Sequence, residues 1–571
     1  MRRLTSTTTL IALGVLLASC APSPSSRPGA GQQPPGAPAA PKSLAFALQG
    51  EPKVIITSLG LGNQPNLGGD VQGAVHQKLA TLDDRGLVFP QLAVELPAQE
   101  NGTWVVRPDG TMQTTYRLRS DVTWHDGTLL TARDFVFAHT VTVDPELPIS
   151  QGKVAPYISR IDTPDDFSLI IEWSQTYPFA NAITEDDLGP LPVHLLESTY
   201  RTDKERFEQL PYWTREFVGV GPYRVVDWVL GSHMSLRAYD GFYAGRAKID
   251  DLTVKFIPSA PTAVANLLAG TLDGVIPQAI DFQQAMFVKS EWERSGKQPI
   301  VIPQSVHWRT MAIQFRPDFA NPRDLLDIRV RRALLHAIDR KSIVDTLFDG
   351  TAPISHSYMP AEDFRWELVS DAVAVFDFDQ RRAQELLTEA GWRRGPDGTW
   401  LTSAGSRANV AEWTTPGYEQ EVAIIADNWK AIGIGADQVV LSPGEAQDRQ
   451  YVASFPGTMT TTFPINFQYW VQRHHGPACS TEANRWVGNN RGCYQNAERD
   501  RVANALNVAI DPGDQRRLFR DLARIESEDV PALPLYFNVQ ITLFRDGVTG
   551  VKRNTAPKTT ATWNVAEWDV R

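Results

Sequence analysis

Cysteine is scarce in this chain: three residues among 571, at positions 20, 479 and 493. So few thiols exclude a small disulfide-built scaffold and a cysteine-rich metal domain. The G-x-S-x-G, H-E-x-x-H and P-loop signatures are also missing, and the ten histidines are scattered apart from the adjacent pair His474 and His475. We therefore predict a binding protein rather than an enzyme, with no catalytic residues and no cofactor.

Positive charge is not in excess either. The chain has 55 basic and 66 acidic residues, a net charge of −11. Nucleic-acid-binding domains carry basic patches, so this balance argues against a nucleic-acid partner. It does not identify a ligand.

The chain begins with a short apolar run rather than a membrane-spanning one, which would need about 20 residues. The run LIALGVLL at residues 10–17 follows Arg2 and Arg3 and precedes small residues, the pattern of a secretory signal. It ends in LASC at residues 17–20, which resembles a bacterial lipobox, whose cysteine becomes the first mature residue and carries lipid. We predict a signal peptide at 1–19 and membrane attachment through lipid on Cys20. An ordinary signal peptide with an unrelated cysteine is the alternative.

Residues 20–42 are rich in Pro, Gly and Ser and predict a flexible tether. Roughly 530 residues follow, enough for two or three domains. Outside the cytoplasm the remaining cysteines, Cys479 and Cys493, are expected to pair, closing a loop of about 15 residues and adding about 3 kcal/mol of stability. A metal site that adds His474 and His475 to them is the competing interpretation.

Strands and helices are expected to alternate along the body, which predicts α/β architecture. Period-two alternation predicts strands at HMSLRAY and DLTVKFIP, and a further strand is expected at residues 438–441. Spacing of 3.6 residues predicts one helix over residues 329–348, a second over 380–390 ending at Gly391, and a third over 421–432 ending at Gly433.

Two acidic clusters are candidates for chemistry, and both are interpreted as structural. In VTWHDGTLLTARDFVF, at residues 122–137, Asp126-Gly127 marks a turn and Thr131 to Asp134 forms a T-x-x-D helix start. Glu526, Glu528 and Asp529 are expected to lie on a solvated helix face.

Several stretches, in order, resemble the family 5 solute-binding proteins of ABC importers, the peptide- and nickel-binding group. They span about residues 44–552. They are VTWHDGTLLTARDFVFAHTV, GVGPYRVVDWVLGSHMSLRAYDGFYAGRAKIDDLTVKFIP, LLAGTLDG, DIRVRRALLHAIDRKSIVDTLFDGTA, LLTEAGW, DNWKAIGI, IESEDVPALPLYF and FRDGVTGV.

The resemblance implies an α/β fold of the two-lobed, hinge-closing periplasmic-binding-protein type (type II) with an extra third domain. The implied divisions are lobe I at 43–88, 214–303 and 533–571, the extra domain at 89–213, and lobe II at 304–532. A solute bound between the lobes would be handed to ABC permease subunits powered by a separate ATPase. This gives an extracytoplasmic protein, in the periplasm or on the cell surface, expected to be a monomer.

The resemblance also implies that the ligand contacts come from VHWRTMAIQF, AEWTTPGY and TMTTTFPINFQYW. The candidate ligand-binding residues are Trp308, Arg309, Trp413, Phe463, Asn466 and Tyr536. One departure matters: peptide-binding members carry an Asp in a D-Y-P-D-P-like segment that pairs with the peptide ammonium, and TTTFPIN at residues 460–466 has no acid. Because a buried, unpaired ammonium is costly, free-amine peptides are disfavoured. Sugars, modified peptides and other polar solutes stay open, and the adjacent His474 and His475 keep a metal chelate open as well.

Two other functions use the same features. One is a secreted, lipid-anchored hydrolase whose catalytic residues assemble from distant positions. The other is a sensor that keeps the fold but passes its ligand-driven closure to a signalling partner.

Overall fold

The computed structural model describes residues 40–56, 68–147, 154–184, 188–465, 467–553 and 560–571. Lys42 to Arg571 form one compact unit. The predicted signal peptide, Cys20, nearly all of the tether and Asn466 lie outside the described residues. No helix in the described part of the chain is long and apolar enough to cross a membrane.

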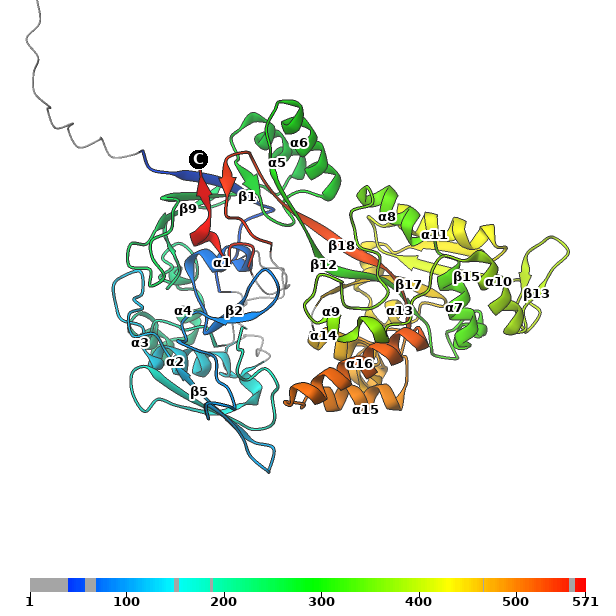
Figure 1. The fold of residues 1–571 in the computed structure, drawn as a ribbon, viewed down its shortest axis with the longest axis horizontal. Helices are drawn as coiled ribbons and strands as arrows, with labels where there is room; N and C mark the ends of the chain where they lie inside the picture. The colour runs from blue at the N-terminus through cyan, green and yellow to red at the C-terminus, as the bar shows by residue number, and fades with distance from the viewer. Residues whose placement is uncertain (1–39, 57–67, 148–153, 185–187, 466, 554–559) are drawn as a thin grey trace, which may run out of the picture. The chain divides into compact units, whose positions relative to one another are not determined.

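A mixed sheet of ten strands forms the framework of this unit (Figure 1). The long strands β12 and β18 lie side by side in it, antiparallel from the Ile300–Phe544 pair to the Ala312–Ala532 pair. In spatial order the strands are β16 (Gly435–Val440), β15 (Asn409–Thr414), β17 (Thr458–Pro464), β12 (Ile300–Ile313), β18 (Ala532–Phe544), β11 (Gly274–Val275), β1 (Ser43–Leu48), β10 (Asp251–Phe256), β9 (His233–Ala238) and β8 (Tyr223–Val229).

Smaller sheets complete the β structure. A four-stranded sheet contains β4 (Trp104–Val106), β5 (Met112–Arg117), β7 (Ser168–Trp173) and β6 (Ile158–Asp162). The two-stranded sheets pair β2 (Ala80–Leu82) with β3 (Val88–Pro90), β13 (Arg393–Arg394) with β14 (Trp400–Leu401), and β19 (Val548–Thr549) with β20 (Asp569–Val570).

The helices are spread over the whole described chain. They are α1 (Gly68–Val75), α2 (Ala132–Thr142), α3 (Val193–Thr202), α4 (Lys204–Glu208), α5 (Ala260–Ala269), α6 (Phe282–Arg294), α7 (Ile328–His336), α8 (Arg340–Phe348), α9 (Trp366–Val369), α10 (Gln380–Glu389), α11 (Glu419–Ala431), α12 (Pro443–Gln447), α13 (Arg449–Ala453), α14 (Phe467–Arg473), α15 (Ala497–Leu506) and α16 (Pro512–Asp529).

The two faces of the β17–β12–β18 region pack into different hydrophobic cores. Met311 and Leu533 belong to a core that includes α7, α8, α10 and α11. Trp308, Phe463 and Phe537 belong to a core with α14, α15 and α16. Neighbouring positions of one strand point to opposite faces, so these strands carry two separate sets of side chains.

Most of the secondary structure expected from periodicity is confirmed. The two alternating stretches form β9 and β10, and the second and third expected helices form α10 and α11. The expected strand at 438–441 is β16, which begins three residues earlier.

The single helix expected over residues 329–348 is wrong, because the chain forms α7 and α8 with a break between them. Asp339 lies at the break with ψ of 84°, and its carboxylate accepts a hydrogen bond from the Ser342 N–H at 3.1 Å. It therefore acts as the N-cap of α8. The hydrophobic periodicity continues through the break and hides it.

The His-Asp stretch at residues 122–137 holds the chain in shape. The Asp134 carboxylate accepts hydrogen bonds from the N–H groups of Thr131, at 2.8 Å, and Val193, at 3.0 Å. The Gly219 N–H donates to His125 Nδ1 at 3.1 Å, and His125 Nε2 donates to the Gly221 carbonyl at 3.0 Å. A carbonyl only accepts, so the ring is neutral with its hydrogen on Nε2. Burial lowers the pKa of His125 to about 4, which keeps it neutral.

The glycines of GVGPY lie against the end of α1, and this close approach leaves no space for a side chain. A Cβ at Gly221 would lie 2.4 Å from the Val75 carbonyl carbon and 2.6 Å from the His76 nitrogen. We expect Gly221→Ala to lower the free energy of unfolding by about 1–3 kcal/mol, as overpacking does in tight sites. Chemical denaturation of the two proteins measures the difference.

Gly444 supplies the matched control. It lies in α12, and nothing lies within 4 Å of a Cβ built there. Gly444→Ala is expected to change the free energy of unfolding by less than about 1 kcal/mol, in the stabilising direction. Equal effects of the two substitutions would contradict the packing argument for Gly221.

Candidate functional site

Arg309 and Tyr536, two of the predicted ligand-binding residues, meet on a buried carboxylate. Glu421 accepts hydrogen bonds from Arg309 Nε, at 2.9 and 3.0 Å to its two oxygens, and from Nη2 at 2.7 Å. The Tyr536 hydroxyl donates to the same carboxylate at 2.5 Å. The Arg309 and Glu421 side chains are each only 1% exposed.

Arg309 makes two further contacts. Its Nη1 donates to Thr462 Oγ1 at 2.8 Å, and its guanidinium carbon lies 3.5 Å from the centroid of the Tyr418 ring. Burial lowers the pKa of Arg309, but the charge and hydrogen bonds of Glu421, together with Tyr536 and Tyr418, raise it by more, so its pKa lies above the usual value. Arg309 is therefore a fully bonded cation that fixes β12, β17 and α11 together.

Trp308 and Phe463, two more predicted residues, meet on the opposite face of the sheet. They are directly opposed in the β12–β17 register. The Arg473 guanidinium carbon lies 4.0 Å from the Trp308 ring centroid and 3.7 Å from the Phe463 ring centroid. Burial lowers the pKa of Arg473 to about 9. A cation–aromatic cluster of this kind stabilises a desolvated charge.

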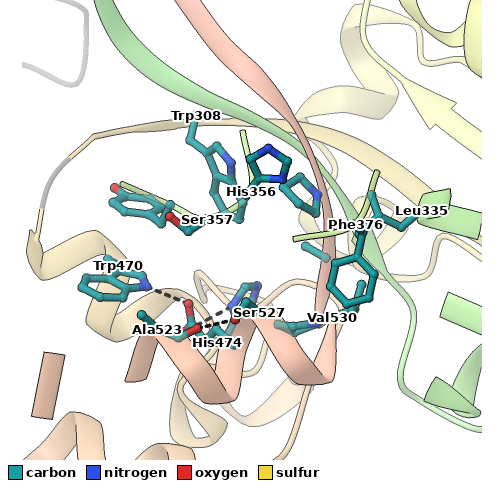
Figure 2. Close-up of a pocket in the computed structure, with 15 residues that line it drawn as sticks. Trp308, Leu335, His356, Ser357, Phe376, Trp470, His474, Ala523, Ser527 and Val530 are labelled. Atoms are coloured by element: carbon teal, nitrogen blue, oxygen red, sulfur yellow. Dashed lines mark hydrogen bonds and ion pairs between the residues drawn. The ribbon is translucent and has the colours of Figure 1, made fainter. Parts of the chain in front are cut away.

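A narrow cavity adjoins this cluster (Figure 2). Trp308 and His356 lie on one side of it and Trp470 and His474 on the other. About 30 Å³ of it is accessible to the centres of water molecules. That space holds one or two waters, so the cavity is too small for a whole solute.

Glu526 is buried beside this cavity, which corrects the expectation that it lies on a solvated helix face. Its carboxylate accepts hydrogen bonds from Arg499 Nη2 at 2.7 Å and from Trp470 Nε1 at 2.7 Å. His474 Nδ1 lies 3.4 Å away. Burial raises the pKa of Glu526, but Arg499 and His474 together outweigh it and lower this pKa to about 2. The Glu528 side chain is 46% exposed, whereas Asp529 accepts a hydrogen bond from the Tyr494 hydroxyl at 2.5 Å.

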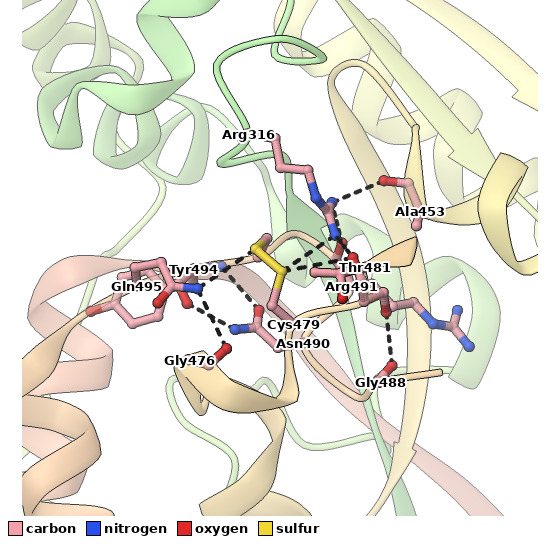
Figure 3. The surroundings of a disulfide bond; sticks show 12 residues. Arg316, Ala453, Gly476, Cys479, Thr481, Gly488, Asn490, Arg491, Tyr494 and Gln495 are labelled. Atoms are coloured by element: carbon pink, nitrogen blue, oxygen red, sulfur yellow. Dashed lines mark hydrogen bonds between the residues drawn. A yellow bond between two sulfur atoms is a disulfide. The ribbon is translucent and has the colours of Figure 1, made fainter. Parts of the chain in front are cut away.

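Cys479 and Cys493 form a disulfide in the structure (Figure 3). Asn490 fixes the loop between them, since its amide donates to the carbonyls of His475 and Tyr494 and its oxygen accepts from the Tyr494 N–H. Among the described residues no group of three or more His, Cys, Asp or Glu side chains is placed to hold a metal ion. The metal interpretation of His474 and His475 therefore finds no further ligand in that part of the chain.

The predicted ligand residues thus form separate groups rather than one cluster. Arg309 and Tyr536 share one face and Trp308 and Phe463 the other. Trp413 packs against Tyr451, with ring centroids 4.8 Å apart, in a small core of its own. Asn466 lies outside the described residues. Direct contact of any of them with a ligand stays a prediction.

Comparison with known proteins decides the family. The family described as bacterial extracellular solute-binding proteins, family 5 middle, matches residues 97–478, more than half of the chain. This chain belongs to that family. Its members are binding proteins that serve ABC importers, so the predicted family, solute-binding function and association with peptide transport are confirmed.

Similar proteins cover nearly the whole chain. The oligopeptide-binding protein AppA of Bacillus subtilis is 24% identical over 571 residues, which is 98% of this chain and 97% of AppA. Heme-binding protein A of Haemophilus influenzae is 22% identical over 463 residues, 76% of this chain and 78% of that protein. The solved structure of the ABC transporter substrate-binding protein CtaP from Listeria monocytogenes has a TM-score of 0.73 at 17% identity, and the match covers 92% of this chain and 99% of CtaP. The predicted two-lobed α/β fold with an extra domain is confirmed.

Sequence reasoning missed four charged side chains of this family member: Glu421, Glu526, Arg473 and Arg491. Glu421 and Glu526 look like ordinary polar positions of amphipathic helices, and nothing in the sequence marks them as buried. Arg473 ends the aromatic helix FQYWVQR, but the rings on which it stacks, Trp308 and Phe463, lie outside that helix. The helix sequence therefore gives no signal for this contact.

Proposed function

We propose that this protein captures one small solute by closing two lobes about β12 and β18, and delivers it to the permease of an ABC importer. The observation that carries the proposal is the shared strand pair. Phe544 at one end of β18 packs with β1, β9 and β10, whereas Leu533 at the other end packs with α7, α8 and α11. Two long strands that join separate cores are a suitable hinge for domain closure.

The register of these strands bears on where the proposed lobes meet. A boundary at 303/304 falls inside β12, and Pro303 pairs with Ile541. Antiparallel partners lie side by side. The point at which β18 passes from lobe II back to lobe I is therefore expected near Ile541, opposite Pro303, rather than at 532/533. We therefore propose to keep lobe I at 43–88 and 214–303 and the extra domain at 89–213, and to extend lobe II to about residue 540. The register shift between Ser305 and His307 lies beside this crossing.

The proposed solute lacks a free ammonium at the position that peptide-binding relatives use. The hydroxyls of Thr460 and Thr414 form a hydrogen bond of 2.7 Å with each other, and the Thr462 hydroxyl accepts a hydrogen bond from Arg309. These partners are neutral or positive, so this stretch offers no carboxylate to an ammonium. The relatives are named for oligopeptide and heme binding, which are different chemistries, and neither name selects a ligand for this chain. A sugar, a modified peptide or another polar solute fits this segment better.

We further propose that lipid on Cys20 anchors the protein outside the cytoplasm. The support is the sequence LASC after the apolar run, together with the Pro-, Gly- and Ser-rich tether that follows. A single receptor chain suffices for capture in this proposal, so the protein acts as a monomer.

The test follows thermal unfolding of the purified protein against free-amine peptides, blocked peptides, sugars and metal chelates. A ligand at 100 times its dissociation constant should stabilise the native state by about 2.7 kcal/mol. A hit among blocked peptides or sugars, with free-amine peptides silent, supports the proposed class. Tight binding of free-amine peptides would overturn the argument from Thr460–Asn466, and turnover of a hit would overturn the assignment as a receptor.

A further inference from the structure

A second small cavity lies between the β12–β17 pair and the disulfide loop. Its empty volume, including space open to solvent, is about 250 Å³, and about 10 Å³ of this is accessible to the centres of water molecules, which is room for about one water. Its lining shares His474 with the first cavity and includes Phe463, Arg473, Asn489 and Arg491.

The charge of Arg473 in this cavity has no directly bonded counter-charge among the described residues. The side chain is 2% exposed, and no carboxylate of the described residues lies within ion-pair distance of it. Trp308 and Phe463 stack on its faces, which leaves its N–H groups free at the edge of the plane. Its Nη1 is buried and makes no hydrogen bond within the described part of the chain. A buried donor without a partner is costly unless something binds it.

Arg491 supplies a second unpaired guanidinium. Its main chain is fixed, because the Arg491 carbonyl accepts a hydrogen bond from Arg316 Nη1 at 2.8 Å, and the disulfide closes the loop that carries it. Its side chain is half-buried, and Figure 3 shows it extending away from the disulfide. Within the described part of the chain it makes no hydrogen bond or ion pair. The backbone thus holds the arginine in place while its side chain stays available.

The nearby acidic and basic groups do not neutralise the two arginines. Glu526 is bonded to Arg499 and Trp470. Burial lowers the pKa of His474 to about 4, so its ring is neutral at neutral pH. The half-buried Asn489 amide, also in the lining, makes no hydrogen bond among the described residues. The cavity therefore combines two free guanidinium groups with a neutral polar side chain.

We propose that this cavity binds the anionic group, a carboxylate or a phosphate, of the solute that the protein transports. Planar guanidinium groups match both oxyanions through paired N–H donors, and stacking on aromatic rings leaves those donors free. The inference rests on the proposed receptor function, because the anionic group is taken to belong to the transported solute. It adds that the solute is acidic at one end, which agrees with the absence of an acid at Thr460–Asn466.

The test titrates the purified full-length protein with sodium phosphate and sodium acetate, at constant ionic strength against sodium chloride, by isothermal calorimetry. We expect saturable binding of one of the two anions, and which one binds separates phosphate from carboxylate chemistry. Arg491→Gln should weaken that binding ~10-fold or more, because a charged hydrogen bond is lost. Arg501→Gln, at an exposed arginine of α15, is the matched control and should leave the affinity within about twofold.

Arg473→Gln should abolish anion binding. Arg473→Lys should weaken it, because lysine keeps the positive charge but lacks the planar guanidinium that stacks on the rings and presents paired N–H donors. If Arg473→Gln fails to fold, Arg491→Gln still tests anion binding. The Arg491 side chain is half-buried and makes no hydrogen bond among the described residues, so its replacement should not prevent folding. Anion binding that is equally strong in Arg491→Gln and Arg501→Gln would overturn the proposal.

The two proposals can fail separately. If no solute stabilises the protein while phosphate or acetate binds through Arg491, the receptor proposal loses support and the anion site stands. If a solute hit is neutral, and binds wild type and Arg491→Gln with the same affinity, the receptor stands and the anion site is overturned.

Discussion

Replacing Glu421 with glutamine should be among the most destabilising single changes in this protein. The substitution keeps the shape of the side chain but removes the charge that Arg309 faces at 2.7 Å in a site where both are 1% exposed. A buried cation without its partner costs about 3–5 kcal/mol. We expect the free energy of unfolding to fall by that amount, measured by chemical denaturation at pH 7.

An exposed pair gives the matched control. Asp345 forms an ion pair with Lys341, one turn earlier on α8. The two side chains are 47% and 73% exposed. Asp345→Asn should change the free energy of unfolding by less than about 0.5 kcal/mol, because exposed ion pairs contribute little. Adding Arg309→Met to Glu421→Gln should recover more than half of the loss, since no buried charge then remains. A loss below about 1 kcal/mol for Glu421→Gln alone would show that Arg309 finds another partner.

The second large effect is a pH dependence that comes from Glu412 on β15. This carboxyl is fully buried, and neither oxygen has a hydrogen-bond partner among the described residues. Burial raises its pKa from 4.5 to about 9, with the Glu421 charge acting in the same direction. Between pH 4.5 and 9 the native state therefore binds one proton more than the unfolded state. The contribution of this group to stability is present below pH 4.5 and is lost as pH rises toward 9.

Glu412→Gln removes this titration and keeps the shape. We expect the variant and the wild type to be similar in stability near pH 4.5, and the variant to be more stable by on the order of 4 kcal/mol at pH 8. Denaturation series at several pH values measure the difference. Glu100→Gln, in an exposed turn, should give a difference that does not change with pH. A flat difference for Glu412→Gln as well would show that the carboxyl is solvated or paired.

Glu412 and Glu421 illustrate what periodicity can and cannot tell. Glu421 lies in α11, a helix that the apolar pattern predicts, and Glu412 lies in the strand β15. The pattern assigns their apolar neighbours to the core, and a glutamate in such an element is expected to face solvent. Only the packing of α11 on β15 and β16 shows that both carboxyls are buried, one paired with Arg309 and one protonated.

The candidate site shows the same limit. The resemblance to the family proposes β12, β15, β17 and β18 as ligand-binding strands, and the register of β12 and β17 places Trp308 opposite Phe463. Strand alternation already puts consecutive residues Trp308 and Arg309 on different faces of the sheet, but the sequence could not show what packs against each face. It also could not show that Arg473, 165 positions after Trp308 in the chain, stacks on it. Such contacts depend on helix placement, which short-range patterns do not encode.

The sequence by itself determined the family, the solute-binding function, the mixed α/β architecture and most helices and strands. These follow from local signals: ordered motifs, periods of 2 and 3.6, and glycines at helix ends such as Gly391 and Gly433. The tertiary structure decided the break at Asp339, the burial of Glu412, Glu421 and Glu526, and the two unpaired arginines beside the disulfide loop. The physical reason is that burial and charge pairing arise between residues far apart in the chain. The local sequence determines only which face of its helix or strand a side chain occupies.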